Sequence, residues 1–491
     1  MKSKFLFLIL NSAFLTTDLS ARAQIQQAWA VKYNNGITNG QHKALKMQLG
    51  SDGNIYVCGF SQNANSNLDY AVLKYAPNVN LLWASRFDST NTIQAQPTGF
   101  ALDPNAQTLV TGNAGTVKYD PQGNLLWTAP YAGNACASDA NGNSFVTGFG
   151  TNFNTVKLSP GGTNLWTATY RDVGPTIGQT IAMDDNGNAY VAGSDVYYYF
   201  SSGPSTSYYA EAVVAKFSSL GSEVWVAAGP GGPSSTVQVA GVACTLSGNV
   251  YMLANYPIGG FGAFNTYNFS ATSGNRLWGA APNAGTGPGN AMALAPNGNI
   301  YLAGNDAFNT DVTFGLQTNG STLWTNYYPR PTIGSSSLNA DTADRANNCY
   351  ITGYCAAANG TNDIVTIAYD LNGKQLWLQR YAGRGYGAVG NAIAADNSGN
   401  VYVAGYESVP GGGTETVLIK YSPVTLQHQS NGSFLLKAQG APNEPFDIQA
   451  TTNLQTWLDL GTQDANTNGL LQYLDTNAAL FPWRFYLAIP Q

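Results

Sequence analysis

Residues 184–193 read Asp-Asp-Asn-Gly-Asn-Ala-Tyr-Val-Ala-Gly, a Gly-containing turn followed by a short alternating apolar segment. Asn-Gly turns join adjacent antiparallel strands, because both residues tolerate a positive φ angle. Copies of this motif recur along the chain, and their turns lie at Gly53, Gln107, Gly142, Gly187, Gly248, Gly298, Asn348 and Gly399. One unit returning at such a spacing indicates a repeat protein.

A second motif, Lys-Tyr-Asp-Pro-Gln-Gly-Asn-Leu-Leu-Trp at 118–127, places a turn before a strand that contains Trp. Its Trp recurs in the same number of copies, at Trp29, Trp83, Trp127, Trp166, Trp225, Trp278, Trp324 and Trp377. Each unit therefore predicts four short strands: an apolar segment, the Tyr-Val segment, a strand ending in Lys-Tyr, and the Trp strand. Helical periodicity is absent, so we expect an all-β fold.

The two ends of the repeat region complement each other. No Trp strand follows Lys420-Tyr421 within the repeat spacing, whereas the strand around Trp29 precedes the first complete unit. We therefore expect the Trp29 strand to become the outer strand of the last unit and to close a ring, which leaves no open end to the array. The pattern predicts a β-propeller of about eight four-stranded blades, or seven if the degenerate unit around 340–353 is not a blade.

The blocks Asp184 to Gly193, Asp396 to Gly405 and Lys118 to Trp127 resemble the bacterial β-propeller repeat (SBBP) family, over roughly residues 26–424. The resemblance implies the propeller fold and no particular function. The Lys118 to Trp127 block is also similar to the tryptophan-docking repeat of quinoprotein dehydrogenases, in which Trp packs between neighbouring blades. Those enzymes hold their quinone with a central metal, charged side chains and often adjacent cysteines, and no two of the five cysteines here are adjacent.

The N-terminus has the pattern of a secretory signal peptide. Lys2 and Lys4 precede an apolar run, and Ala21-Arg22-Ala23 matches a cleavage site. We therefore expect a signal peptide over 1–23, a propeller over 24–424 and a secreted, extracellular or cell-surface protein.

The tail departs from the repeat. Residues 425–491 are expected to form a small β-sandwich-like domain of a kind common in secreted bacterial proteins. Its four short strands are predicted around 434–436, 446–450, 471–474 and 485–487. The alternative is a ninth, distorted blade.

Composition excludes some classes of partner. Only 10% of the residues are charged, and 21 Lys and Arg stand against 27 Asp and Glu, a net charge of −6. A nucleic-acid ligand requires a basic surface, so none is expected. No apolar run after the signal peptide reaches the length of a membrane-spanning helix, so no membrane insertion is expected. We expect a monomer that binds a protein or a glycan.

Loop lengths indicate where a ligand would bind. In a propeller, the links from strand one to two and from three to four share one rim, and here they are short. We call this the uniform rim. The opposite rim, the variable rim, carries the remaining links and two insertions, at 195–209 and 256–261. Variable loops on a rigid scaffold commonly carry binding residues.

The first insertion supplies tyrosines that can stack on sugar rings or anchor a protein partner, namely Tyr197, Tyr198, Tyr199, Tyr208 and Tyr209. Alternatively, these tyrosines pack the insertion against its own blade. Arginines follow the Trp strands on the same rim, at Arg86, Arg171, Arg330, Arg380 and Arg384. Together they would bind a carboxylated ligand, unless they are separate solvated side chains.

Signals for catalysis are weak. The chain has two histidines, His42 and His428, and no nucleophile-elbow motif near them. The turns at 139–143 and 184–188 resemble calcium loops but lack the Glu at position twelve, so a hairpin turn explains them better. No cofactor is predicted, and calcium remains the minor alternative.

Taken together, the sequence predicts a secreted, non-catalytic binding scaffold. The alternatives are an extracellular enzyme, either carbohydrate-active or quinone-dependent, and a structural surface or adhesion component.

Overall fold

The structure is a computed structural model. It describes residues 24–490 except for 38, 89–93, 151, 173, 201–205, 233–236, 246–247, 259–260, 282–286, 306–309, 329–333, 454 and 482–483. The predicted signal peptide therefore lies outside the described residues. Within these residues the regular structure is β-strand, apart from one 3-10 turn at Ala478–Leu480. The described residues include no helix that is long and apolar enough to cross a membrane.

Seven blades are separate four-stranded antiparallel sheets of consecutive strands. Blade 1 holds β2 (His42–Leu49), β3 (Ile55–Gln62), β4 (Leu68–Tyr75) and β5 (Leu81–Phe87). Blade 2 holds β6 (Pro97–Leu102), β7 (Thr108–Gly112), β8 (Gly115–Tyr119) and β9 (Leu125–Ala129). Blade 3 holds β10 (Ala135–Ser138), β11 (Ser144–Thr147), β12 (Phe153–Leu158) and β13 (Asn164–Tyr170). Blade 4 holds β14 (Thr176–Met183), β15 (Ala189–Phe200), β16 (Thr206–Phe217) and β17 (Glu223–Ala228).

The next three blades follow the same plan. Blade 5 holds β18 (Gln238–Cys244), β19 (Asn249–Ile258), β20 (Phe261–Ser270) and β21 (Arg276–Ala280). Blade 6 holds β22 (Gly289–Leu294), β23 (Ile300–Asn305), β24 (Asp311–Leu316) and β25 (Thr322–Tyr328). Blade 7 holds β26 (Ser336–Ala343), β27 (Cys349–Ala356), β28 (Asn362–Tyr369) and β29 (Gln375–Tyr381). The degenerate unit around 340–353 is therefore a complete blade.

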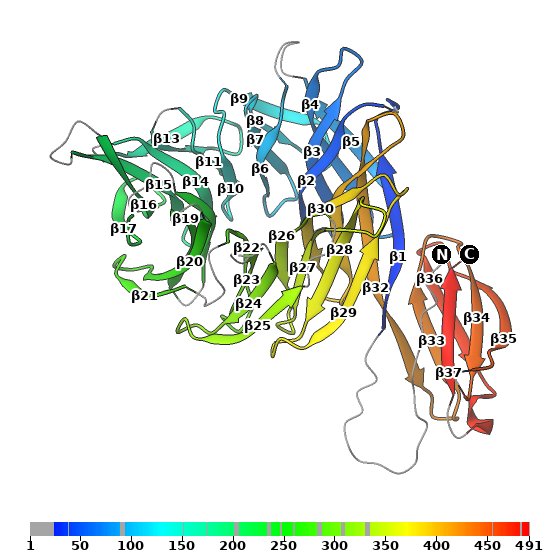
Figure 1. The fold of residues 1–491 in the computed structure, drawn as a ribbon. Helices are drawn as coiled ribbons and strands as arrows, with labels where there is room; N and C mark the ends of the chain where they lie inside the picture. The colour runs from blue at the N-terminus through cyan, green and yellow to red at the C-terminus, as the bar shows by residue number, and fades with distance from the viewer. Residues whose placement is uncertain are drawn as a thin grey trace.

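Blade 8 combines both ends of the repeat region. Its first three strands are β30 (Ala388–Ala395), β31 (Val401–Ser408) and β32 (Thr414–His428). The fourth is β1 (Gln24–Tyr33), which pairs antiparallel with β32 so that Trp29 lies opposite Lys420. The fold is thus an all-β propeller of eight four-stranded blades (Figure 1).

The repeated Asp-x-Asn-Gly-Asn turn is stabilised by hydrogen bonds to its own Asp side chain. In blade 4, Asp184 Oδ1 accepts hydrogen bonds from the backbone N–H groups of Asn186 and Asn188, at 3.0 and 2.9 Å. Asp184 Oδ2 accepts from the Tyr190 hydroxyl, also at 3.0 Å. Gly187 takes the left-handed conformation with φ +75°, which favours glycine. The Asp carboxylate therefore caps the turn, as the hairpin interpretation predicts.

Side-chain amides link the blades near the central axis. All innermost strands except β10 carry a β-bulge, and in several blades the side chain of the bulged residue bonds to the next blade. Asn339 Nδ2 donates to Gly390 O of blade 8, and Asn391 Nδ2 donates to Ala44 O of blade 1, at 2.9 and 2.8 Å. Strand β30 of blade 8 also contacts β2 of blade 1.

Farther out, six of the Trp side chains form a hydrogen bond to the next blade. Each indole N–H donates to a backbone carbonyl of the following strand-three-to-four turn, as in the bond from Trp83 Nε1 to Pro121 O at 2.9 Å. The others are Trp127, Trp166, Trp225, Trp278 and Trp324. In the same turns a glycine lies against the indole face, because a Cβ atom at Gly123 would come within 2.7 Å of the Trp83 ring. The Leu-Trp strand thus provides a repeated contact between blades.

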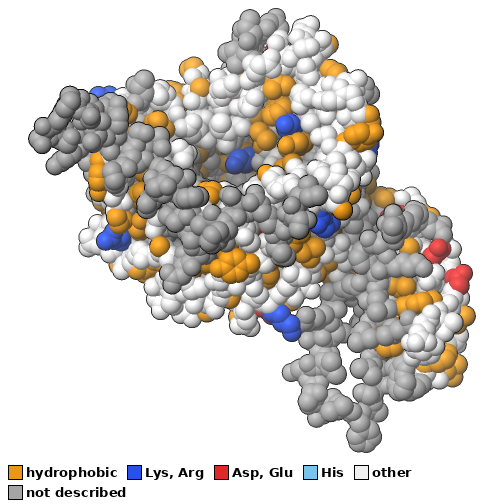
Figure 2. All heavy atoms as spheres, viewed as in Figure 1, with side chains coloured by type: hydrophobic (Ala, Val, Ile, Leu, Met, Phe, Trp, Pro, Cys, Tyr) orange, Lys and Arg blue, Asp and Glu red, His pale blue; other side chains and the backbone are white. Residues whose placement is uncertain are grey.

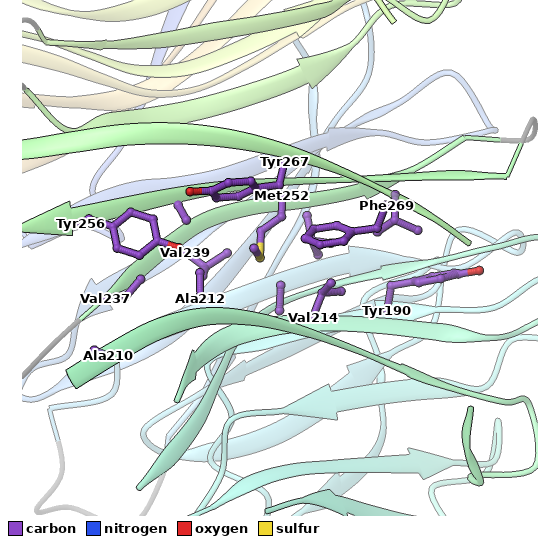
Figure 3. Close-up of a cluster of buried hydrophobic side chains, with 14 of the residues drawn as sticks. Tyr190, Ala210, Ala212, Val214, Val237, Val239, Met252, Tyr256, Tyr267 and Phe269 are labelled. Carbon is purple, nitrogen blue, oxygen red and sulfur yellow. The ribbon is translucent and has the colours of Figure 1, made fainter. Parts of the chain in front are cut away.

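The core consists of apolar layers between neighbouring sheets. One layer, between blades 4 and 5, is shown in Figure 3, with Tyr256 and Tyr267 toward one end, Met252 in the middle, and Tyr190 and Phe269 toward the other end. All five side chains are buried.

The C-terminal residues form two further groups of strands (Figure 1). They are β33 (Phe434–Gln439), β34 (Pro445–Thr451), β35 (Leu458–Asp464), β36 (Leu470–Asp475) and β37 (Phe485–Pro490). Strand β33 pairs with the end of β32 and with β36, whereas β34 pairs with β35 and β37. Four strands were expected here and five are present. Strand β35 was missed because it is exposed along most of its length, so its sequence lacks a clear apolar pattern. The pairing also differs from that of a ninth blade.

Candidate functional site

The variable rim differs most in blades 4 and 5. Strands β15 and β16 have 12 residues each, and β19 and β20 have 10 each. In blades 1, 2, 3, 6 and 7 the corresponding strands have at most eight residues. The two insertions predicted as variable links are therefore extensions of hairpins, and that of blade 4 projects at the left of Figure 1.

The predicted tyrosines lie on the blade 4 hairpin. Tyr197 is paired across the strands with Tyr209, Tyr198 with Tyr208, and Tyr199 follows on β15. Tyr209 is half-buried, and its ring lies against Gly231 of its own blade. Tyr209 therefore packs locally. The side chains of the other four lie outside the described part of the structure, and their binding role stays a prediction.

The predicted arginines do not form one cluster. Arg380 pairs with Asp363 at 3.1 Å, and Arg86 pairs with Asp69. Arg384 pairs with two carboxylates of blade 8, described below, while Arg171 is exposed and Arg330 lies outside the described residues. On the face of the molecule shown in Figure 2, Lys and Arg side chains are scattered singly. The ion pairs compensate the charge of Arg86, Arg380 and Arg384 within the propeller.

The acidic partners of these arginines were missed in the sequence. In blade 8, Glu407 and Glu415 lie opposite each other on β31 and β32. Arg384 Nε lies 3.4 Å from Glu407 Oε1, and Arg384 Nη2 lies 3.0 Å from Glu415 Oε2. Lys32 Nζ lies 2.5 Å from Glu407 Oε1, and the Tyr381 hydroxyl donates to Glu407 Oε2 at 2.9 Å. The blade 8 rim thus holds two buried carboxylates, two cations and one tyrosine.

Blade 4 has a similar set of acids. Asp195 lies opposite Glu211 on β15 and β16, and the Tyr170 hydroxyl donates to Asp195 Oδ2 at 2.9 Å. Asp172, in the link before β14, is close enough to raise the pKa of both acids. Burial is the largest cause of the shift and, with the neighbouring carboxylates, raises the pKa of Asp195 to about 6. We call Asp172, Asp195 and Glu211 the blade 4 acidic group.

Two hollows among the described residues lie on opposite rims. The larger, about 600 Å³, lies on the uniform rim and is lined by turns of blades 5 to 8, including Asp344, Arg345 and Asp396. Asp344 and Asp396 each accept hydrogen bonds within their own turns, so both carboxylates are engaged. The smaller, about 300 Å³, lies on the variable rim beside Tyr386 and Tyr406.

Among the described residues, side chains able to bind a metal ion are not brought together. In the parts of the chain that the structure describes, no three His, Cys, Asp or Glu side chains could share a metal ion. All five cysteines are unbridged. His42 is buried, with Nδ1 bonded to the Ser61 hydroxyl at 2.8 Å and Nε2 to Ile37 O at 3.0 Å. Burial lowers the pKa of this imidazole, which therefore has a structural role between two segments.

Comparison with one solved structure supports the fold. Among solved structures, Chaetomium thermophilum Sqt1, bound to the N-terminus of the ribosomal protein L10, matches with a TM-score of 0.52 and 9% identity, covering 81% of this chain and 100% of that chain. A protein of unknown function from Bacteroides caccae matches with a TM-score of 0.32 and 12% identity, covering 52% of this chain and 90% of that chain. A search of curated proteins found no match.

The fold defines the class as a β-propeller. Residues 376–406, which run from the Trp strand of blade 7 into β31, match the family model described as a beta-propeller repeat (SBBP). This match confirms the resemblance over these residues, which carry one repeat of this type.

Proposed function

We propose that the protein is a secreted, non-catalytic scaffold that binds a protein partner at the variable rim of blades 4 and 5. The proposal divides the chain into a signal peptide (1–23), a propeller (24–424) and a C-terminal β-domain (425–491). The observation that carries it is the extension of two adjacent hairpins, β15–β16 and β19–β20, on a rim where the other hairpins are short.

The base of these hairpins is rigid, which favours specific binding. Ala210, Val239, Tyr256 and Tyr267 belong to one buried apolar layer between blades 4 and 5 (Figure 3). A preordered support lowers the entropic cost of binding, because the partner meets a surface that already has its bound shape. The propeller Sqt1, which its structure shows bound to the N-terminus of a ribosomal protein, supports a polypeptide as the type of ligand.

A peptide-display experiment tests this function. Residues 24–491 would be used to select 12-residue peptides from a random library, and affinities would be measured by fluorescence anisotropy. In the test variant, a two-residue Asn-Gly turn replaces 198–208 and connects the cross-strand partners Tyr197 and Tyr209. The matched control is Arg345→Glu, at the hollow on the uniform rim.

We expect the selected peptides to bind the wild type and Arg345→Glu equally and to bind the shortened variant at least tenfold more weakly. Circular dichroism and the melting temperature would establish that the shortened variant is folded. Failure to select any peptide, or equal binding by the shortened variant, would contradict the proposed function.

A further inference from the structure

We propose that the blade 4 acidic group receives the ammonium or guanidinium group of a Lys or Arg side chain from the protein partner. The inference rests on the proposed function and adds the chemistry of one contact. It is carried by a comparison of two blades that share one arrangement of residues at the variable rim.

Blades 4 and 8 correspond position by position. Asp195 and Glu211 are opposed across β15 and β16 as Glu407 and Glu415 are across β31 and β32. The acid on strand two also accepts a hydrogen bond from the last tyrosine of the preceding blade in each case, at 2.9 Å. The two rims therefore hold the same pair of carboxylates in the same local structure.

Blades 4 and 8 differ in the cations that surround these carboxylates. In blade 8, Lys32 on the outer strand lies opposite Val417, and it forms an ion pair with the acid on strand two. The corresponding residue of blade 4 is Ala228, opposite Val213. Ala228 is exposed, as Lys32 is, so the position has room for a longer side chain.

The second cation of blade 8 is also replaced. Arg384, in the link that leads into blade 8, contacts both carboxylates. The link that leads into blade 4 places Asp172 beside the pair, which adds negative charge. Within the described parts of the chain, no Lys, Arg or His forms an ion pair with Asp195 or Glu211.

Burial makes this arrangement costly in the free protein. The Asp195 side chain is fully buried, no N–H group donates to its Oδ1 among the described residues, and the Asp172 carboxyl lies within hydrogen-bonding distance of Asp195. A buried carboxylate without a cation is destabilising, and carboxylates directly opposite each other on a sheet repel. The raised pKa of Asp195, about 6, reflects this environment. A cation supplied by a partner would take the place that Lys32 and Arg384 occupy in blade 8.

The site favours an organic cation over a metal ion. Three carboxylates suitably placed to share one metal ion do not occur in the described part of the chain. Glu211 is half-buried and Asp172 is exposed, so the group is open to solvent above the buried Asp195. A long side chain with a charged end fits such an opening, because its aliphatic part can lie along the hairpin while the charge meets the acids.

The test uses hairpin-dependent peptides from the selection described above. Each Arg would be replaced by citrulline and each Lys by acetyl-lysine, which are neutral and similar in size. The protein variants are Ala228→Lys, which supplies an internal cation as in blade 8, and Asp195→Asn combined with Glu211→Gln. Ala281→Lys is the matched control, because it adds the same charge to an exposed position just after β21 of blade 5.

We expect one basic residue to be common to the peptides, and its neutral replacement to weaken binding at least tenfold, as is usual for loss of a desolvated ion pair. Ala228→Lys and the double variant should cause a similar loss, whereas Ala281→Lys should change affinity less than twofold. Ala228→Lys should also raise the melting temperature, which shows that the lysine meets the acids. Binding to the wild type should weaken below about pH 6, where Asp195 becomes protonated.

Two failures are distinguishable. If no hairpin-dependent peptide is selected, the proposed function fails and this inference fails with it. If such peptides bind but tolerate citrulline, acetyl-lysine and Ala228→Lys with less than twofold change, the rim binds a peptide and the acidic group is not its cation site. Equal losses with Ala228→Lys and Ala281→Lys would also overturn the inference, because they would indicate general charge repulsion.

Discussion

Asp341 breaks an apolar layer that surrounds the central axis. It lies on β26 opposite Ile351 of β27. The residues at the same register in the other innermost strands are Met47, Phe100, Cys136, Ile181, Val242, Met292 and Ile393. Asp341 Oδ2 is buried and has no hydrogen-bond partner among the described residues. We predict that Asp341→Ile, which introduces the side chain found in blades 4 and 8, stabilises the protein.

The magnitude follows from linkage between protonation and folding. Burial raises the pKa of Asp341 well above its ordinary 3.8, while hydrogen bonds from its own backbone N–H and that of Ala293 oppose the shift. The folded protein holds a proton that the unfolded chain releases, so stability falls as the pH rises above 3.8. Each pH unit costs about 1.4 kcal/mol, and pH 7 lies about three units higher, which sets an upper bound of about 4 kcal/mol. We expect Asp341→Ile to raise the free energy of unfolding at pH 7 by about 2 kcal/mol. For a chain of this size that corresponds to about 2 °C in Tm.

Scanning calorimetry between pH 4.5 and 8 would check this prediction. Asp341→Asn is the isosteric variant that cannot titrate, so the wild type should lose stability relative to it as the pH rises. Ile393→Asp makes the reverse change at the same register of blade 8 and should destabilise. A lower Tm for Asp341→Ile at pH 7, or parallel pH profiles for the wild type and Asp341→Asn, would refute the reasoning.

Three further substitutions test contacts within and between blades. Lys118→Met leaves the fully buried Asp103 carboxylate without its cation, 3.0 Å away, and should cost about 3–5 kcal/mol in urea unfolding. The added change Asp103→Asn removes the unpaired charge, keeps an acceptor for the N–H groups of Asn105 and Gln107, and should restore part of that loss. Gly123→Ala places a Cβ atom 2.7 Å from the indole of blade 1 and should lower Tm more than Gly53→Ala, which has a similar φ angle and no atom within 4 Å; equal losses would show that φ alone matters. Asn391→Ala removes the hydrogen bond from the Asn391 side-chain amide of blade 8 to Ala44 O of blade 1, and should cost about 1–2 kcal/mol. An unchanged urea midpoint would contradict this role.

The fold was predictable because its determinants are local. Each Asp-x-Asn-Gly-Asn turn is closed by its own Asp carboxylate, as at Asp184. The turn therefore fixes the register of the two strands that it joins. The Trp strands add a contact that repeats with the sequence period, as between Trp83 and Pro121. A pattern that contains its own hydrogen-bond partners needs no tertiary information to be interpreted.

Strand β35 was not predictable for the opposite reason. Residues 458–464 are mostly exposed, and although Leu460 packs against the buried core, the strand is held mainly by backbone pairing with β34. Hydrophobic periodicity therefore has nothing to detect there. The insertion in blade 4 was also located from the sequence, but its β-strand structure was not predicted. That structure depends on pairing between residues such as Tyr197 and Tyr209 on the two strands, which no local motif specifies.

The rim charges show what a search for clusters of one residue type misses. The arginines were grouped because they follow Trp strands, but Arg86, Arg380 and Arg384 each have an acidic partner in the structure. Arg86 and Arg380 both lie 17 residues after their acids, Asp69 and Asp363, because each pair spans strands three and four of one blade. That fixed separation is visible in the sequence, and a search for acidic and basic residues 17 positions apart in each unit would have found it.

Equivalent positions in a repeat fold give an internal reference for each residue. Where seven blades place an apolar residue and the eighth places Asp341, the exception identifies a position that lowers stability and that no local motif requires. Where blade 8 neutralises Glu407 and blade 4 leaves Asp195 in the same setting without a cation, the exception lies on the rim with the longest hairpins. The first exception lies against the neighbouring blade, so its effect is confined to folding. The second faces a rim open to solvent, so its missing charge can be supplied from outside. This difference in surroundings is why the same kind of anomaly predicts a stability effect at Asp341 and a binding contact at the blade 4 acidic group.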